Sequence, residues 1–240
     1  MIGRILDFLF PPLCPICGAS VFGHGQICAE CWNRFDWISE PMCARCGYPF
    51  PADLKGGEML CPDCMTTRSK MDWMRGACVY DDASRDVMLP FKHGGRLEFQ
   101  ELMIRAMISA LRGLDKRFEP GTMIVMPVPL ATRRLWKRGY NQAALLARGI
   151  AKHFKAKVDF DSVRRKFRAD MGHKRRDARR RNIAGVFDVR RAKAVQGRAI
   201  LLVDDVYTTG ATFDELAKAL KKAGAAWVGG ITFCRVVRAI

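Results

Sequence analysis

The sequence predicts an α/β protein in which a parallel sheet flanked by helices follows a small metal-binding module. Continuous apolar runs at 122–129 and 199–203 are typical of strands covered on both faces, and an amphipathic stretch follows each of them. Strands that alternate with helices favour a parallel sheet with right-handed crossovers. Cysteine spacing predicts the metal-binding module, because eight of the ten cysteines lie within the first 64 residues.

The elements of the sheet domain are expected in a regular order. Apolar or alternating runs predict strands at 73–80, 122–129, 158–163, 199–203 and 227–233. Helical periodicity predicts helices at 83–92, 97–111, 143–154 and 213–220, the last of which is closed by Gly224. The second strand ends in prolines, which cannot extend the hydrogen-bonding ladder of a central strand.

The eight N-terminal cysteines form four Cys-x-x-Cys pairs, and each pair places two thiolates on one side of a Zn²⁺ ion. The first cluster consists of Cys14, Cys17, Cys28 and Cys31, and the second cluster consists of Cys43, Cys46, Cys61 and Cys64. Disulfides are the alternative. No secretory signal is visible before the first pair, so we expect a cytoplasmic protein, and a reducing compartment favours metal. Two closed, structural zinc sites without a catalytic role are therefore predicted.

Length and composition agree with this division. The chain of 240 residues is long enough for one α/β domain and a small module, which we place at 69–240 and 1–68. The cysteine-rich part lacks a long apolar run and is expected to need metal to fold. A transmembrane helix is not expected, because no run of 18 apolar residues occurs. The net charge of +17 predicts polyanionic partners: nucleic acid, an acidic lipid surface or phosphorylated substrates.

The loop at 204–212, directly after the strand at 199–203, carries the most informative motif of the chain. Adjacent carboxylates without basic neighbours in the sequence suit a ribose diol, or a diol together with Mg²⁺. The following threonine hydroxyls suit phosphate oxygens, and a helix start attracts anions. The expected ligand-binding residues are Asp204, Asp205, Thr208, Thr209, Gly210, Ala211 and Thr212.

An alternative interpretation makes Thr212 and Glu215 a simple capping box, but it leaves the two aspartates and two further threonines unexplained. The 204–212 loop resembles the phosphoribosyl-pyrophosphate (PRPP) loop of type I phosphoribosyltransferases. In that family two acidic residues hold the ribose hydroxyls, and the threonine-rich turn holds the 5′-phosphate.

The order of motifs along the chain is more specific than any one of them. Two pairs of zinc knuckles precede Pro127-Val-Pro129-Leu130, Arg138-Gly139-Tyr140-Asn141-Gln142, Arg179-x-x-Asn182 and the 204–212 loop. This order resembles the ComF family, amidophosphoribosyltransferase-like proteins linked to bacterial competence and DNA uptake. The resemblance covers essentially the whole chain and implies a double zinc ribbon followed by a type I phosphoribosyltransferase fold.

The resemblance further implies that the loop at 129–141 handles pyrophosphate. Its expected binding residues are Pro129, Arg138, Gly139 and Asn141, with Arg133, Arg134 and Lys137 as additional cations. The alternative is that the Arg-Gly-Tyr-Asn-Gln motif only starts a helix, with Asn141 near the cap.

The basic segment at 164–181 departs from the family pattern. Family members commonly carry Thr-x-x-Gln-x-x-Leu, whereas the corresponding positions here are Arg168, Met171 and Lys174. In type I enzymes this region is a mobile loop that closes over the substrate, which implies a catalytic role for Arg179 beside the two aspartates. The segment holds ten Lys or Arg against two Asp, so contact with single-stranded DNA and a merely solvated basic loop are alternatives.

Two functions follow from these observations. The first is Mg²⁺-dependent transfer of ribose 5-phosphate from PRPP to an unidentified acceptor, in nucleoside metabolism or DNA uptake. The second is a non-catalytic competence factor that binds PRPP and single-stranded DNA and docks on the DNA-uptake machinery. Trp32, Phe35 and Trp37 could stack on bases, although core packing is the commoner use of such residues. The acceptor, the oligomeric state and the partner of the ribbons stay open.

Overall fold

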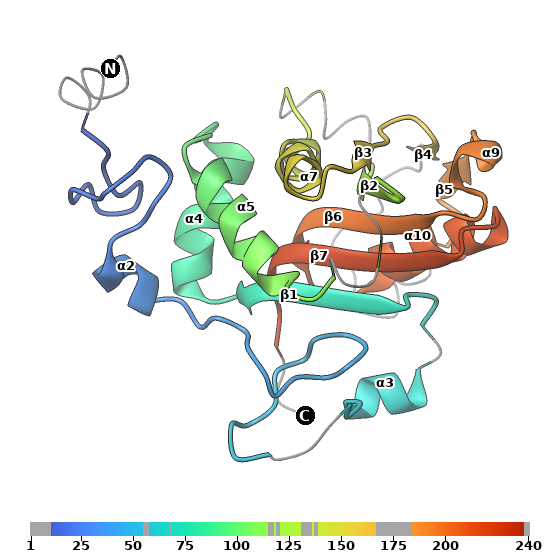
Figure 1. The fold of residues 1–240 in the computed structure, drawn as a ribbon, viewed down its shortest axis with the longest axis horizontal. Helices are drawn as coiled ribbons and strands as arrows, with labels where there is room; N and C mark the ends of the chain where they lie inside the picture. Colours follow the sequence, from blue (N-terminus) through green and yellow to red (C-terminus); the bar gives the residue numbers. More distant parts are fainter. Residues whose placement is uncertain are drawn as a thin grey trace.

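The computed structural model describes residues 11–54, 58–67, 69–114, 118, 121–130, 136, 139–166 and 184–237. A five-stranded parallel sheet in the order β1-β7-β6-β2-β3 forms its centre (Figure 1). Its strands are β1 (Trp73–Val79), β2 (Met123–Pro127), β3 (Lys157–Val158), β6 (Ala199–Tyr207) and β7 (Trp227–Arg235). The fold is therefore the α/β sheet that the sequence predicts.

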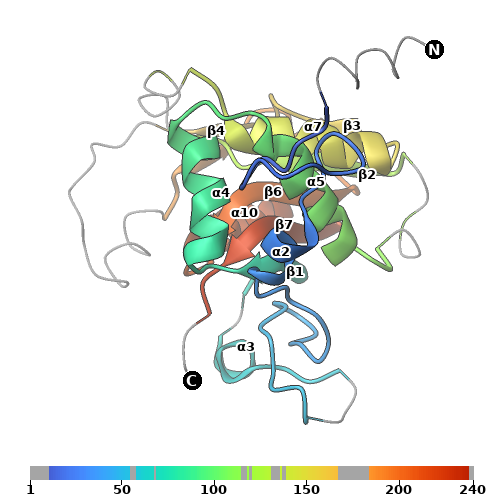
Figure 2. The same cartoon turned by 90° about the vertical axis from the view of Figure 1, so that its left-hand side faces the viewer.

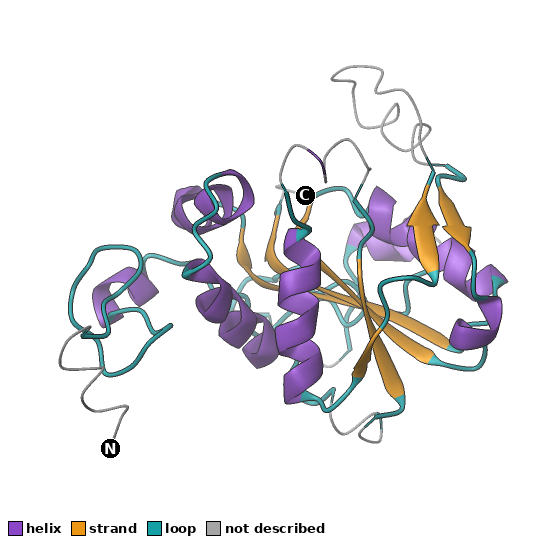
Figure 3. Cartoon of the chain, turned by 90° about the horizontal axis from the view of Figure 1, so that it is seen from above, coloured by secondary structure: helices purple, strands orange, loops and turns teal. Residues whose placement is uncertain are grey.

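The strand expected at 158–163 is the one wrong prediction among the strands. These residues divide between β3 and β4 (Val163–Arg165), and β4 pairs antiparallel with β5 (Phe187–Val189) in a separate sheet (Figure 3). A turn lies between β3 and β4, because the carboxylate of Asp159 accepts the backbone N–H groups of Asp161 and Ser162 at 2.9 Å each. Such a side-chain turn ends the strand and sends the chain away from the main sheet.

Helices cover both faces of the main sheet. The helices α4 (Asp82–His93), α5 (Phe99–Ala110) and α7 (Gln142–His153) pack on one face, and α10 (Ala211–Lys222) packs on the other. Successive side chains of β6 alternate between these faces: Leu201 and Val203 join the first core, whereas Ile200 and Leu202 join the second. A strand buried on both faces accounts for the continuous apolar run in the sequence. A short helix, α9 (Ala192–Val195), precedes β6.

Among the described residues of the cysteine-rich part, Ala29–Asn33 and Pro62–Thr66 form the five-residue helices α2 and α3. Figure 2 shows α2 beside β1 and α3 below it. The chain between the two clusters runs along the edge of the main sheet, where Ile38 N–H donates to the Ala77 carbonyl at 3.0 Å and Val79 N–H donates to the Asp36 carbonyl at 2.8 Å. This segment covers the open edge of β1. In the described part of the chain, no helix has the length and apolar character needed to cross a membrane.

Candidate functional site

The 204–212 loop begins inside β6 and continues into α10 at the carboxyl edge of the sheet. Gly210 has φ +72° and is the residue that precedes the helix. A side chain at this position would overlap the Tyr207 hydroxyl, so the turn requires glycine. The N-cap residue Gly210 has no side chain to accept a hydrogen bond from the first turn of α10, which leaves backbone N–H groups of that turn directed at the loop. The loop therefore has the geometry of an anion site.

The capping-box alternative for this loop is wrong. The N-cap of the helix is Gly210, two residues before Thr212, so Thr212 lies inside the first turn and is not the cap. The carboxylate of Glu215 accepts the backbone N–H of Gly185 at 2.7 Å instead. Thr209 orients the turn locally, because its hydroxyl accepts the Ala211 N–H at 3.4 Å.

The two adjacent aspartates occupy different environments. Asp204 is half-buried, and its carboxylate accepts the Asp205 N–H at 2.9 Å. Asp205 is buried, and its carboxylate lies 2.7 Å from the Lys92 ammonium. The pair has no basic neighbour in the sequence, but Asp205 has one in space. Lys92 lies more than a hundred residues away in the sequence, and only the tertiary fold brings this residue of α4 to the site.

The Arg-Gly-Tyr-Asn-Gln motif holds the end of α4 that carries Lys92. The Tyr140 hydroxyl donates to the Phe91 carbonyl, and the Gln142 amide donates to the Lys92 carbonyl at 2.9 Å. Asn141 is the N-cap of α7, since its side-chain oxygen accepts the Ala143 N–H at 3.1 Å. The helix-start alternative is therefore confirmed for Asn141, and the motif also positions the cation beside Asp205.

The loop expected to handle pyrophosphate leaves the neighbouring strand at the same edge. Val128 N–H donates to the Val203 carbonyl at 2.9 Å, so half-buried Pro129 directly follows a residue that is paired with β6. Gly139 is exposed and has φ +76°. The expected cations of this loop all lie outside the described residues: Arg133, Arg134, Lys137 and Arg138.

The described residues on either side of the basic segment lie near α10. Most of the segment, including Arg179, lies outside the described residues, as does Asn182. The first two residues of the segment, Arg164 and Arg165, belong to β4. The next described residue after the segment is Ala184, shortly before β5. Lys166 N–H donates to the Val186 carbonyl at 2.7 Å, which joins the two ends. The bond between Gly185 and Glu215 ties them to the helix that begins at the 204–212 loop.

The eight N-terminal cysteines gather into the two expected clusters. In each cluster the four sulfur atoms lie within 4.8 Å of one another. One pair in each cluster, Cys17 with Cys28 and Cys46 with Cys61, has its sulfurs 3.6 Å apart. A tetrahedral zinc ion with Zn–S bonds near 2.3 Å requires a separation of about 3.8 Å. All ten cysteines lie in the described part of the chain and none forms a disulfide.

The thiols of each cluster differ in acidity. Burial favours a higher pKa for Cys14, but hydrogen bonds from the backbone of Cys17, Cys28 and Ile16 outweigh it and lower the pKa to about 6. Burial, together with hydrogen bonds to neighbouring thiols, raises the pKa of Cys31 to about 12. In the second cluster, hydrogen bonds with Cys46 and Cys64 hold the pKa of Cys43 far below its usual range. Zinc must displace the protons of the weakly acidic thiols, so its binding weakens as pH falls.

Comparison with known proteins identifies both parts of the chain. The family model described as a double zinc ribbon domain matches residues 5–65, and the one described as a phosphoribosyl transferase domain matches residues 141–238. The chain is 31% identical to "DNA utilization protein YhgH" of Escherichia coli O157:H7, over 95% of this chain and 98% of that protein. The chain belongs to the ComF family.

Two further members of the ComF family are similar over most of their length. "Competence protein ComFC" of Bacillus subtilis is 27% identical over 88% of this chain and 84% of its own. "Competence protein F" of Haemophilus influenzae is 28% identical over 82% of this chain and 85% of its own. The ComF fold of this chain is thus a double zinc ribbon followed by a phosphoribosyltransferase domain, and its two four-cysteine clusters fit two structural zinc ions.

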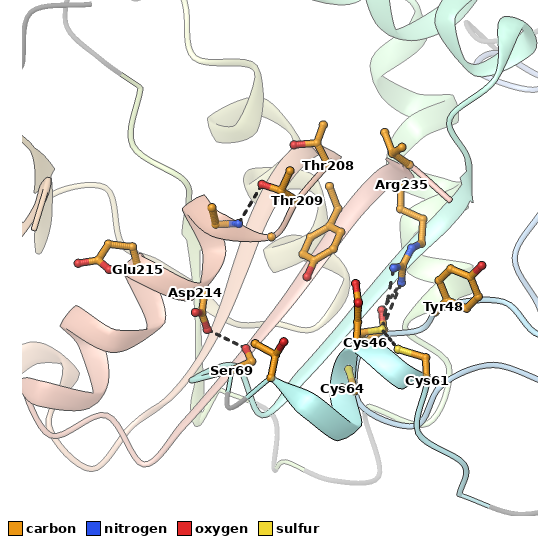
Figure 4. Close-up of a pocket in the computed structure, with 16 residues that line it drawn as sticks. Cys46, Tyr48, Cys61, Cys64, Ser69, Thr208, Thr209, Asp214, Glu215 and Arg235 are labelled. Atoms are coloured by element: carbon orange, nitrogen blue, oxygen red, sulfur yellow. Dashed lines mark hydrogen bonds between the residues drawn. The ribbon is translucent and has the colours of Figure 1, made fainter. Parts of the chain in front are cut away.

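Sequence reasoning missed that the second cluster of this ComF protein lies beside the 204–212 loop. A cavity of about 370 Å³ separates them, with Cys46, Tyr48 and Cys64 on one side and 207–211 on the other (Figure 4). Arg235, the last residue of β7, also lines the cavity. The sequence offers only a weak signal for this arrangement, an arginine directly after the apolar run that ends at Cys234.

Proposed function

We propose that this ComF protein binds PRPP with Mg²⁺ at the 204–212 loop and transfers its ribose 5-phosphate to a nitrogen acceptor during DNA utilization. The observation that carries the proposal is the glycine turn at the carboxyl end of the central strand, which opens a helix with glycine as its N-cap residue beside Asp204. Ligands of open α/β sheets bind at this edge. The names of the relatives, which are competence and DNA utilization proteins, support a DNA-related role.

The charges of the site fit a ligand with several phosphates. Asp204 is the half-buried carboxylate and offers a hard oxygen ligand of the kind that Mg²⁺ prefers, as well as an acceptor for ribose hydroxyls. Asp205 is neutralised by Lys92 at 2.7 Å. This ion pair lowers the negative charge that the loop presents to the ligand, and so reduces repulsion of the pyrophosphate.

The reaction is a displacement at the anomeric carbon. The bond between this carbon and a pyrophosphate oxygen breaks, pyrophosphate leaves with the bonding electrons, and the acceptor nitrogen forms the new bond. Thr208, Thr209 and the start of α10 would hold the 5′-phosphate, while Asp204 would orient the ribose. Arg138 and Arg179 would stabilise charge on the leaving group. Bound Mg²⁺ would neutralise part of the charge that builds up on pyrophosphate.

Titration of PRPP and Mg²⁺ into the protein by calorimetry tests the binding step. Asp204→Asn removes the charge at nearly constant shape, and we expect PRPP affinity to fall by ~1.5–3 kcal/mol, which is the worth of a charge-assisted hydrogen bond. Asp161→Asn is the control, because this aspartate is exposed in an ion pair with Arg191 away from the loop. Equal affinity of the Asp204 variant and wild type would overturn the assignment of the site.

Turnover needs a separate measurement. Release of pyrophosphate from PRPP would be followed with nucleobases or single-stranded DNA as acceptors, using the Asp204 variant as the blank. Binding of PRPP without release under every condition would favour the second function, a PRPP- and DNA-binding factor without catalysis. The ten basic residues at 164–181 are the observation that supports that alternative.

A further inference from the structure

The cavity between the second cluster and the 204–212 loop contains a buried guanidinium. Arg235 is 5% exposed, and its guanidinium donates to the carbonyl of Cys46. The same group lies 3.8 and 3.9 Å from the Cys46 sulfur through its two terminal nitrogens (Figure 4). No ion pair in the described part of the chain includes Arg235. Its cationic charge is therefore directed at the cysteine cluster and not at a carboxylate.

The charge of a loaded cluster explains this placement. Zn²⁺ bound by four thiolates carries a net charge of about −2, and such a site is stabilised by N–H groups that hydrogen-bond to the sulfurs. Arg235 supplies one positive charge and the N–H donors from the transferase domain. At the first cluster the corresponding cation, Arg34, is half-exposed and pairs with Asp86 at 2.9 Å. The two clusters therefore differ in the origin and burial of their nearest arginine.

Arg235 also contacts the strand that leads into the 204–212 loop. It is the register partner of Tyr207, and Val236 N–H donates to the Tyr207 carbonyl at 2.8 Å. The guanidinium lies 5.3 Å from the centre of the Tyr207 ring and 5.6 Å from that of Tyr48. The Tyr207 hydroxyl in turn fills the space next to Gly210. Packed contacts thus run from Cys46 through Arg235 and Tyr207 to the turn of the loop.

A second connection joins the same two regions on the other side of the cavity. Two ligands of the second cluster, Cys61 and Cys64, lie at the N-cap of α3 and within it. The segment that follows α3 ends beside α10. There the Ser69 hydroxyl and the Lys70 N–H donate to the Asp214 carboxylate at 2.8 and 2.7 Å. Asp214 lies in the first turn of α10, whose N–H groups face the 204–212 loop. The second cluster therefore contacts the loop through the strand before it and the helix after it.

We infer that the second zinc site and the 204–212 loop form one cooperative unit in which Arg235 is the positioning residue, so that zinc there and a phosphate-bearing ligand strengthen each other's binding. The first zinc site stays independent. This inference rests on the proposed function for its ligand, PRPP. Coupling between binding sites is reciprocal, so each side of the unit reports on the other.

Zinc release from the full-length wild-type protein tests this coupling without a mutation. A zinc-selective chelator and a zinc-sensitive dye would be used with and without saturating PRPP and Mg²⁺. We expect PRPP to slow the release of one zinc ion about fivefold or more, in the usual range of coupling between sites, and to leave the other unchanged. The Cys17→Ser variant, which lacks the first site, identifies the protected ion as the second. If PRPP binds but protects neither ion, or both equally, the inference is wrong.

Arg235→Met tests the positioning residue, with Arg34→Met as the matched control that removes a guanidinium near the first cluster. We expect the Arg235 variant to release the second zinc faster and to bind PRPP at least about fivefold more weakly, because the coupling is lost. The Arg34 variant should match wild type in PRPP affinity. If Arg235→Met does not fold, Arg235→Lys replaces it, because lysine keeps the charge without the forked donors of arginine. We expect the lysine variant to show smaller changes in the same direction, both in the release rate of the second zinc and in PRPP affinity.

The two proposals fail in different ways. If wild type does not bind PRPP, the proposed function is wrong, and the zinc-release rates of the Arg235 and Arg34 variants still test whether Arg235 stabilises the second cluster. If wild type binds PRPP and the Arg235 variant matches it in both assays, the proposed function stands and this inference is overturned.

Discussion

The two zinc ribbons have the same ligand chemistry and almost the same spacing, yet they lie in different surroundings. In the first cluster Cys17 is exposed, whereas no ligand of the second cluster is. The first ribbon contacts the helical layer through side chains, among them that of Arg96 between α4 and α5, which donates to the Pro15 carbonyl at 3.1 Å. Its ion pair with α4 in the described part of the chain, Arg34 with Asp86, is half-exposed on both sides. Contacts of this kind contribute little to stability.

The second ribbon is joined to the sheet through its backbone. Met74 N–H donates to the Arg45 carbonyl at 2.8 Å, and the Arg75 guanidinium donates to the Ala44 carbonyl at 3.1 Å. Gly47 packs so closely on β1 that a side chain there would lie 2.9 Å from the Met74 carbonyl. Because the ligands of the two clusters are the same, the structural role of each zinc knuckle depends on the surface that it contacts.

Removal of each cluster should give the largest difference between the ribbons. Cys14→Ser with Cys31→Ser, and Cys43→Ser with Cys61→Ser, should each lower the zinc content from two ions to one. A structural zinc site contributes ~10–16 kcal/mol of binding free energy. Between the two clusters, the second is the one whose knuckle is hydrogen-bonded through its backbone to β1. We expect the second variant to lose much more thermal stability. Elemental analysis and thermal unfolding measure both effects, and equal losses of stability would contradict the comparison.

The segment that joins the ribbons should show the next largest effect. Phe35 is buried, stacks on Trp37 at 4.8 Å between ring centres and meets Phe233 edge-on at 6.3 Å. Phe35→Ala should lower the free energy of unfolding by ~3–5 kcal/mol. Trp32→Ala is the control, because this ring is 46% exposed. Denaturant unfolding measures both variants. A near-neutral Phe35 variant that loses single-stranded DNA affinity would restore the base-stacking alternative.

The contact between the second ribbon and the 204–212 loop can be tested at Gly210. Gly210→Ala places a methyl group against the Tyr207 hydroxyl, whereas Gly197→Ala at φ +68° meets nothing within 4 Å. Both variants should lose ~1–2 kcal/mol through the left-handed backbone alone. Only Gly210→Ala should also weaken PRPP binding and speed release of the second zinc. Calorimetry and chelator competition distinguish them, and identical behaviour would show that Tyr207 does not link the two regions.

The smallest effect concerns DNA, for which the basic segment and the ribbons are alternative contacts. Neutralising Arg175, Arg176, Arg179, Arg180 and Arg181 should flatten the salt dependence of single-strand binding by ~0.7 for each DNA phosphate that the variant no longer neutralises. If these residues close over PRPP instead, the same variant should lose PRPP affinity or turnover at an unchanged salt slope. Filter binding over a range of salt concentrations and calorimetry separate the outcomes. If the variant matches wild type in both assays, neither role applies, and the segment is a solvated basic loop without a dedicated ligand.

Most of the fold could be predicted because its signals are local. The apolar runs of β2 and β6 reflect burial on both faces, and each cluster is recognisable because its ligands lie within about twenty residues. Local reasoning was wrong at 158–163, where the Asp159 turn interrupts an otherwise strand-like run. It also could not identify the partner of Asp205, because Lys92 lies in a distant element, α4.

The sequence by itself determined the parallel sheet, the two zinc clusters and the 204–212 loop, since each depends on periodicity or spacing within one stretch of chain. Only the tertiary structure decided that the two clusters differ. The cation beside the second one, Arg235, is 189 residues from Cys46 in the sequence. The packing of the second ribbon onto β1 and the end of β7 brings these residues together. No spacing rule specifies a contact between segments so far apart, because it depends on how whole elements pack.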